Sequence, residues 1–215
     1  MAPRKHIIIS GTGRSGTTFL VELLTHLGLD TGFAVDELEW RKNNGARAGL
    51  ENDIRQDDCP YVVKNPAFCE YAEEILRNKD INVEQVIVPI RDLNAAADSR
   101  RFVTETQRNT LSRYKQLRQK IKKREFPGGL WRTGSDKNGS QEKVLLKLVY
   151  DLMLAISDSP VEVTFIRYPR IVKDDLYLYE KLRPILGSIP YESFATKFNQ
   201  VARTELVHCF NEKDS

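Results

Sequence analysis

The sequence predicts a single α/β domain in which helices flank a central, mostly parallel β-sheet. Short apolar runs alternate along the chain with longer stretches whose apolar residues recur at helical spacing, and this alternation is typical of βαβ units. The length of 215 residues suits one domain with a substantial core. Hydrophobic residues make up 40% of the chain and charged residues 29%, which is typical of a soluble globular protein.

The expected strands are short apolar runs, and they alternate with the expected helices. The strand candidates are residues 6–10, 32–35, 61–64, 83–90 and 161–168. The helix candidates are residues 17–28, 67–78, 93–106, 141–157 and 174–187. Gly28 and Gly187 stand at the ends of two of these helices, where glycine is favoured.

One stretch of the domain, residues 123–141, carries four glycines and many polar residues. This composition predicts a long loop, expected to be mobile, within the single domain 1–215. Trp131 in this loop is either a hydrophobic anchor or a residue that closes over a substrate. Together with the region after Val35, the loop is expected to shape the substrate pocket.

The net charge of +3 is small, but the charges are distributed unevenly. Residues 100–125 hold ten Lys or Arg and two Glu, so the rest of the chain is net acidic. This basic segment indicates either an anionic ligand or partner nearby or a solvated helix face. No run of 18 apolar residues occurs, so no membrane span is expected.

The sequence favours a cytoplasmic location. The apolar run near the N-terminus is too short for the core of a signal peptide. Cys59, Cys69 and Cys209 show no metal-ligand spacing, and an odd number of cysteines favours a reducing compartment. Each cysteine is expected to be a small core residue.

A glycine-rich turn between the first expected strand and helix predicts a phosphate-binding loop. Residues 11–18 read GTGRSGTT, and the backbone N–H groups of such a turn, with the N-terminus of the following helix, attract an anion. Gly11 and Gly16 have the spacing of the P-loop of nucleoside triphosphatases, but Thr17 stands where that loop has lysine. The sequence therefore predicts a P-loop-like architecture without the lysine that bridges a triphosphate chain. Arg14 supplies a cation inside the loop instead.

A second motif follows the strand 83–90. Arg91 comes directly after the strand, and Ser99 lies eight residues further on, just over two turns of the expected helix. A guanidinium and a hydroxyl on one helix face can together bind one phosphate group. Asp92 is expected to cap this helix rather than to bind magnesium.

A third motif, Lys64-Asn65-Pro66, ends the strand 61–64. Ligands of parallel sheets bind at the carboxyl ends of the strands. Residues 10–18, 64–66 and 91–99 are therefore expected to meet at one edge of the sheet.

These motifs resemble those of the sulfotransferases that use 3′-phosphoadenosine 5′-phosphosulfate (PAPS). The sequence GTGRSGTTFL is similar to their 5′-phosphosulfate loop, in the arginine form of Golgi-type, tyrosylprotein-type and bacterial members. The pair Arg91 and Ser99 resembles their 3′-phosphate site, although Leu93 replaces a proline. The resemblance covers roughly residues 6–190.

The resemblance implies roles for each motif. The 5′-phosphosulfate would be bound by Gly13, Arg14, Ser15, Gly16, Thr17 and Thr18, and the 3′-phosphate by Arg91 and Ser99. Arg14 would also stabilise charge on the bridging oxygen, and Lys64 would offset charge on the transferring sulfuryl group. No metal would take part.

Transfer to a hydroxyl needs a base, which in this family is a histidine or a glutamate. His6, His26 and His208 do not follow a strand end at the predicted site. Acidic residues do follow the expected strand 32–35, where Golgi-type relatives carry their glutamate. Glu37 is therefore the expected base, with Glu39 and Asp36 as alternatives.

The sequence thus predicts an enzyme that transfers a sulfuryl group from PAPS, leaving PAP, to a hydroxyl or amine. The acceptor would be a small molecule, a carbohydrate or a peptide, and no nucleic acid is expected as a partner. One alternative is a P-loop kinase that uses ATP and magnesium, which Thr17 disfavours. Another is a non-catalytic nucleotide-binding module whose basic segment 100–125 binds an acidic partner.

Overall fold

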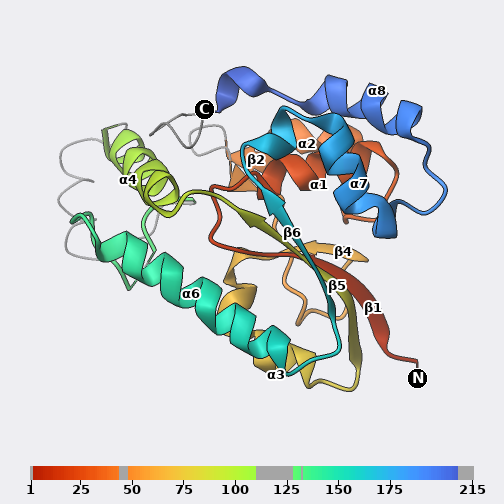
Figure 1. The fold of residues 1–215 in the computed structure, drawn as a ribbon, viewed down its shortest axis with the longest axis horizontal. Helices are drawn as coiled ribbons and strands as arrows, with labels where there is room; N and C mark the ends of the chain where they lie inside the picture. Colours follow the sequence, from red (N-terminus) through yellow and green to blue (C-terminus); the bar gives the residue numbers. More distant parts are fainter. Residues whose placement is uncertain (1, 44–47, 110–127, 132, 208–215) are drawn as a thin grey trace.

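The computed structural model describes residues 2–43, 48–109, 128–131 and 133–207 of the chain (Figure 1). Within these residues a four-stranded sheet has the order β4-β1-β5-β6, and every neighbouring pair is parallel. Its strands are β1 (Arg4–Ile9), β4 (Val62–Lys64), β5 (Ile81–Ile90) and β6 (Glu162–Arg167). The predicted α/β class with a parallel sheet is confirmed.

The central strand β1 is buried on both faces, which explains its continuous apolar run. Ile7, Ile8 and Ile9 are each at most 1% exposed. Ile7 and Ile9 pack into one hydrophobic cluster and Ile8 into another, because successive side chains of a strand point to opposite faces. Such runs are typical of strands in parallel sheets covered on both sides.

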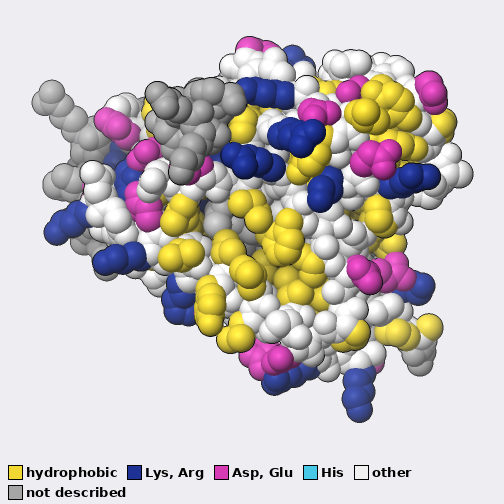
Figure 2. All heavy atoms as spheres, in the orientation of Figure 1, with side chains coloured by type: hydrophobic (Ala, Val, Ile, Leu, Met, Phe, Trp, Pro, Cys, Tyr) yellow, Lys and Arg dark blue, Asp and Glu magenta, His cyan; other side chains and the backbone are white. Residues whose placement is uncertain are grey.

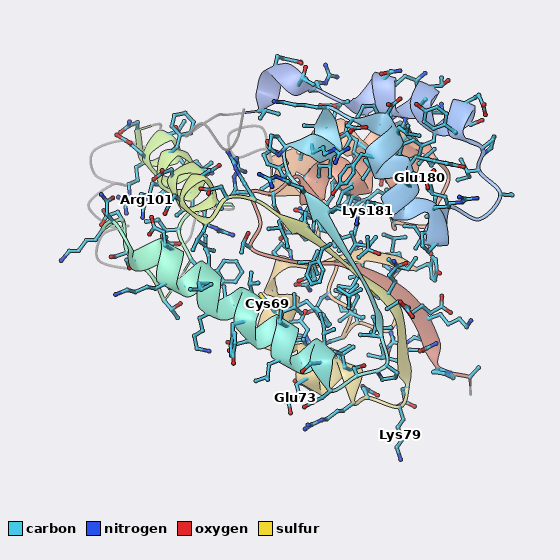
Figure 3. All side chains as sticks on the ribbon, viewed as in Figure 1. Cys69, Glu73, Lys79, Arg101, Glu180 and Lys181 are labelled. Carbon is cyan, nitrogen blue, oxygen red and sulfur yellow. The ribbon has the colours of Figure 1, made fainter. Side chains whose placement is uncertain are left out.

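Helices cover both faces of the sheet (Figure 1). The cluster of Ile7 and Ile9 includes α1 (Thr17–His26), α7 (Asp175–Leu186) and α8 (Tyr191–Val201). The cluster of Ile8 includes α3 (Ala72–Leu76) and α6 (Ser140–Ser157). Helix α4 (Leu93–Asn109) packs on α6, and Arg101 of α4 pairs with Glu142 of α6 at 2.6 Å (Figure 3).

The short elements depart most from the sequence prediction. No strand forms at 32–35, so that prediction is wrong: Gly32 adopts a φ of +74°, and a 3₁₀-helix begins at Val35. A glycine with positive φ breaks the extended backbone that a four-residue strand requires. The remaining short elements are η1 (Val35–Glu37), α2 (Leu38–Arg41), the hairpin strands β2 (Lys42–Asn43) and β3 (Ala48–Gly49), η2 (Pro66–Glu70), η3 (Arg170–Val172) and η4 (Thr204–Leu206).

The predicted loop 123–141 is described in part. Residues 128–131 and 133–139 form neither helix nor strand, whereas Ser140 already begins α6. Residues 123–127 and 132, like most of the basic segment 100–125, lie outside the described residues. Cys69 is buried under α6 (Figure 3) and Cys59 packs beside the same cluster, as expected for core cysteines; Cys209 is outside the described residues.

The surface carries apolar side chains over α6 and β6. Helix α6 exposes Leu146, Tyr150, Met153 and Leu154. Figure 2 shows hydrophobic side chains gathered across the middle of this face. None of the helices in the described ranges is both long and apolar enough to cross a membrane.

Candidate functional site

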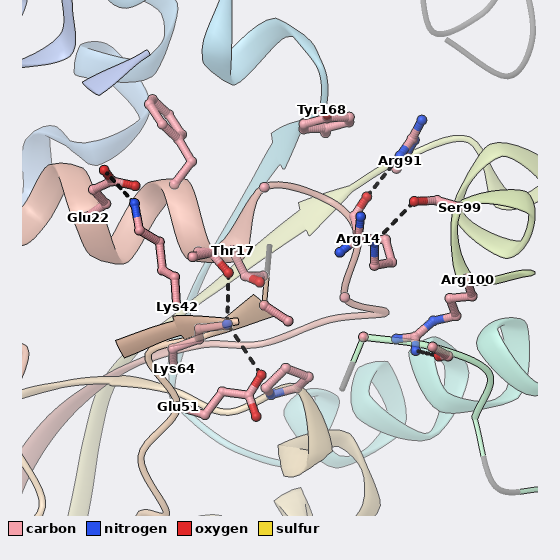
Figure 4. A pocket seen from close by; sticks show the side chains of 18 of the residues that line it. Arg14, Thr17, Glu22, Lys42, Glu51, Lys64, Arg91, Ser99, Arg100 and Tyr168 are labelled. Atoms are coloured by element: carbon pink, nitrogen blue, oxygen red, sulfur yellow. Dashed lines mark hydrogen bonds and ion pairs between the residues drawn. The ribbon is translucent and has the colours of Figure 1, made fainter. Parts of the chain in front are cut away.

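A cavity of about 980 Å³ lies at the carboxyl ends of β1, β4 and β5 (Figure 4). Its walls include residues from all three predicted motifs: Gly13, Arg14, Gly16, Thr17 and Thr18, then Lys64, Asn65 and Pro66, then Arg91 and Ser99. The prediction that these stretches meet at one edge of the sheet is confirmed. Ser15 belongs to the same loop but is fully buried beneath it.

The glycine-rich loop has an unusual backbone. Four of its residues have positive φ: Gly11 (+137°), Gly13 (+63°), Arg14 (+57°) and Gly16 (+85°). A Cβ on Gly16 would lie 2.7 Å from Ile171 Cδ1, so this position has no room for a side chain. Helix α1 then begins at Thr17 without a side-chain cap, so its first N–H groups are available to a ligand.

A hydrogen bond joins the first two motifs. Arg14 Nε donates to Ser99 Oγ at 3.0 Å, and Arg91 Nη1 donates to the carbonyl of Arg14 at 3.1 Å. The Arg91 guanidinium also lies 4.9 Å from the centre of the Tyr168 ring. Asp92 accepts a hydrogen bond from the backbone N–H of Ala95, so its predicted role as a helix cap is confirmed. The two predicted anion sites therefore adjoin within one cavity.

Lys64 approaches the loop from β4. Its side chain is 2% exposed, and Nζ donates to Thr18 Oγ1 at 3.0 Å, to Glu51 Oε1 at 3.3 Å and to the carbonyl of Gly49. Burial lowers the pKa of Lys64, and the nearby Glu51 carboxylate opposes this shift. A lysine thus reaches the first turn of α1 although Thr17 stands at the usual lysine position of the loop.

Arg100 is a further cation of the cavity that the sequence analysis did not single out. Its guanidinium donates to the carbonyl of Gly129 at 2.6 Å and to the carbonyl of Thr12, and it lies 4.9 Å from the Trp131 ring centre. The side chain is 4% exposed, and burial, with the charge of Arg14, lowers the pKa of Arg100 to about 10. Arg100 therefore ties the glycine-rich loop to residues 128–131.

Residues 128–131 form one wall of the cavity. Trp131 is held by its backbone, which exchanges hydrogen bonds with the Gln141 amide, and by its indole N–H, which donates to Glu70 at 3.0 Å. Trp131 therefore packs against the core, as expected of a hydrophobic anchor, and it also lines the cavity.

The three acidic residues predicted as bases are placed differently. Glu37 and Asp36 do not line the cavity, and Glu37 pairs with Arg41 at 3.9 Å. Glu39 lies at the cavity rim, where Lys42 donates to it at 2.7 Å and lowers its pKa. The structure thus brings one of the three to the cavity, and there a lysine already binds it.

The two histidines that the structure describes, His6 and His26, do not line the cavity. His6 lies within β1, where its Nδ1 contacts the Pro60 carbonyl at 2.7 Å. His208 lies outside the described residues. In the described ranges no group of three or more His, Cys, Asp or Glu residues is arranged to hold a metal ion.

Sequence reasoning also missed Glu51, which lines the cavity beside Lys64. No periodic pattern marks its segment, and only the folded chain brings it to Lys64.

Comparisons with known proteins add nothing to this geometry: no protein-family model, curated protein or solved structure matches the chain.

Proposed function

We propose that this protein is a sulfotransferase with a P-loop-like fold, which moves a sulfuryl group from PAPS to a hydroxyl or amine of an acceptor. The observation that carries the proposal is the hydrogen bond from Arg14 to Ser99. It joins two cationic sites in one cavity, and PAPS is a ligand that carries an anionic group at both its 5′ and its 3′ end. Because Cys59 and Cys69 are free thiols, we also propose a reducing, cytoplasmic location.

In this proposal the loop binds the 5′-phosphosulfate. The N–H groups of residues 13–18 and the N-terminus of α1 surround the anion, and Arg14 stabilises charge on the oxygen that leaves sulfur. Arg91, on the other side of the Arg14–Ser99 contact, binds the 3′-phosphate together with Ser99. Lys64 offsets charge on the transferring group, a role supported by its hydrogen bond to Thr18 in the first turn of α1.

The remaining walls suit an acceptor. Residues 128–131 and Pro66 present apolar surface to the cavity, while Glu51 and Glu70 present carboxylates. Such a mixed wall accommodates an organic molecule that carries a hydroxyl or an amine.

Calorimetry with PAP, PAPS and ATP, each with and without magnesium, tests the proposal. We expect PAP to bind without magnesium, and Arg14→Ala and Arg91→Ala each to weaken binding about 10-fold or more, because each removes a charge-assisted hydrogen bond to phosphate. Arg183→Ala on the exposed surface of α7 is the matched control and should leave PAP binding unchanged.

The alternatives give different results. ATP binding that requires magnesium, with no binding of PAP, would point to a kinase and exclude the proposal. PAP binding with no release of PAP from PAPS would point to a non-catalytic nucleotide-binding module. PAP binding that survives both arginine substitutions would reject the assignment of the site.

A further inference from the structure

The segment that carries Glu51 has an unusual backbone. In the described part of the chain, Arg14 and Leu50 are the two non-glycine residues with positive φ, and both values are +57°. Leu50 is 3% exposed, and a bulky buried residue rarely adopts this conformation. Strained residues of this kind cluster at functional sites, where surrounding contacts hold them in place.

The contacts around Lys64 explain what this backbone achieves. The residues on both sides of Leu50 bind the same ammonium group: the Gly49 carbonyl and the Glu51 carboxylate both accept hydrogen bonds from Lys64 Nζ. The third acceptor is Thr18 Oγ1, in the first turn of α1 after the loop. The left-handed backbone at Leu50 therefore places a carboxylate beside the lysine that contacts the first turn of α1.

Glu51 is also accessible from the cavity. Its side chain is 53% exposed although its partner Lys64 is 2% exposed, so one face of the carboxylate contacts the buried lysine and the other remains open (Figure 4). A base needs this combination: a fixed position and an oxygen that can reach the acceptor.

The other carboxylates that line the cavity are less suitable. Glu22 and Glu39 both accept from Lys42 and not from Lys64, the lysine that also donates to Thr18. Glu70 accepts from the Trp131 indole. Glu205 makes no contact with Lys64 or the loop in the described structure.

We infer that Glu51, and not Glu37, Glu39 or Asp36, is the base that activates the acceptor, and that Lys64 holds it beside the sulfuryl group. This inference rests on the proposed function. As the acceptor oxygen forms its bond to sulfur, its proton moves to the Glu51 carboxylate. The bond from sulfur to the 5′-phosphate oxygen breaks with its electron pair on that oxygen, whose charge Arg14 stabilises. The products are the sulfated acceptor, PAP and a protonated Glu51, which returns its proton to water.

The test is Glu51→Gln, because glutamine can still accept a hydrogen bond from Lys64 but cannot take up the proton. Release of PAP from PAPS is measured with 2-naphthol, with a nitrophenol that is already ionised at the assay pH, and with water as acceptor. We expect Glu51→Gln to lower the rate with 2-naphthol about 100-fold or more. The rate with the ionised nitrophenol should fall far less, because no proton remains to be removed, and PAP affinity should stay unchanged.

Glu73→Gln is the matched control, because Glu73 is an exposed carboxylate of α3 paired with Arg77 outside the cavity. It should leave both rates unchanged. Glu37→Gln and Glu39→Gln are the competing variants: a large loss in either, with little loss in Glu51→Gln, overturns the assignment. An equal loss with both phenols overturns it as well, because that pattern indicates a structural role.

The two proposals fail in different ways. If the unmodified protein releases no PAP from PAPS with any of the three acceptors, the proposed function fails, and the role of Glu51 fails with it. If it releases PAP and Glu51→Gln does so at the same rate, the role of Glu51 alone is rejected.

Discussion

Arg14 Nε donates a hydrogen bond at 3.0 Å to Ser99 Oγ, which lies 85 residues further along the chain. Arg14 belongs to a loop held by β1 and α1, whereas Ser99 belongs to α4, which follows β5. Because β1 and β5 are parallel neighbours, their carboxyl ends bring the loop and the helix together. The contact thus joins the side chain of the glycine-rich loop to the helix that follows β5.

The first prediction concerns Ser99→Ala. We expect PAP affinity to fall about 10-fold, since the substitution removes a hydrogen bond to a charged group and one expected ligand of the phosphate. Folding stability should change little, because alanine suits a helix interior better than serine. Calorimetry measures the affinity, and urea unfolding measures the stability.

Ser188→Ala, at an exposed position after α7, is the control for Ser99→Ala. It should leave PAP affinity unchanged. Equal affinities of the Ser99→Ala variant and the unmodified protein would show that the Arg14–Ser99 contact has no part in binding.

The second prediction concerns Gly13→Ala. A Cβ at this position would lie 2.7 Å from Arg100 Nη2, and the φ of +63° itself disfavours alanine. Gly28→Ala is the matched control, because Gly28 has a similar φ of +83° with no atom within 4 Å of the added Cβ. We expect Gly28→Ala to cost about 1 kcal/mol of unfolding free energy, and Gly13→Ala to cost more and also to weaken PAP binding. Urea unfolding and calorimetry measure both effects, and equal costs at the two positions would contradict the prediction.

The sequence was informative where the signal is local. The buried run of β1, the glycine-rich turn and the start of α1 are consecutive in the chain, so their chemistry is visible without the fold. The spacing of Arg91 and Ser99 follows from helix geometry, and their place at the same edge as Lys64 follows from the parallel sheet. These predictions needed no knowledge of long-range packing.

The sequence was less informative where contacts join distant segments. Glu51 meets Lys64, and Arg100 meets Gly129, through loops that carry no periodic pattern. The run at 32–35 is too short to distinguish a strand from a packed loop, and there Gly32 decided the outcome. Helix α8 is a different case, because Phe194, Phe198 and Val201 do recur at helical spacing and could have been recognised.

The third prediction concerns pH and His6. The Pro60 carbonyl can only accept, so the Nδ1 of His6 carries the proton, while Nε2 is buried without a partner in the described structure. Burial, aided by Arg4 and opposed by the Pro60 hydrogen bond and Asp30, lowers the pKa of His6. Below about pH 6.5 the unfolded state therefore binds more protons than the folded state. The unfolding free energy should then decrease as the pH is lowered, by up to about 1.4 kcal/mol per pH unit.

Urea unfolding between pH 7.5 and 5 tests this dependence. His6→Asn keeps an amide that can donate to Pro60 but removes the titrating ring, so its stability should fall less on acidification than that of the unmodified protein. His26→Gln is the control and should retain the full acid-dependent loss, because His6 is still present. If His6→Asn and the unmodified protein lose stability in parallel, His6 does not cause the loss.

The fourth prediction concerns Arg100→Lys. The guanidinium binds two backbone carbonyls at once, those of Thr12 and Gly129, and a lysine ammonium has no planar fork to do so. One buried carbonyl then loses its partner, at a cost of about 1–3 kcal/mol of unfolding free energy. Since Arg100 also lies against the Trp131 ring, the wall formed by residues 128–131 should loosen.

Trp131 itself can report this change. The chain has two tryptophans, so in a Trp40→Phe background all tryptophan emission comes from Trp131. We expect Arg100→Lys to shift that emission to longer wavelength and to increase its quenching by acrylamide, because the indole becomes more accessible to water. Arg183→Lys, on the exposed face of α7, is the matched control and should change neither. Unchanged emission together with unchanged stability in Arg100→Lys would mean that Arg100 does not hold the wall of the cavity to the glycine-rich loop.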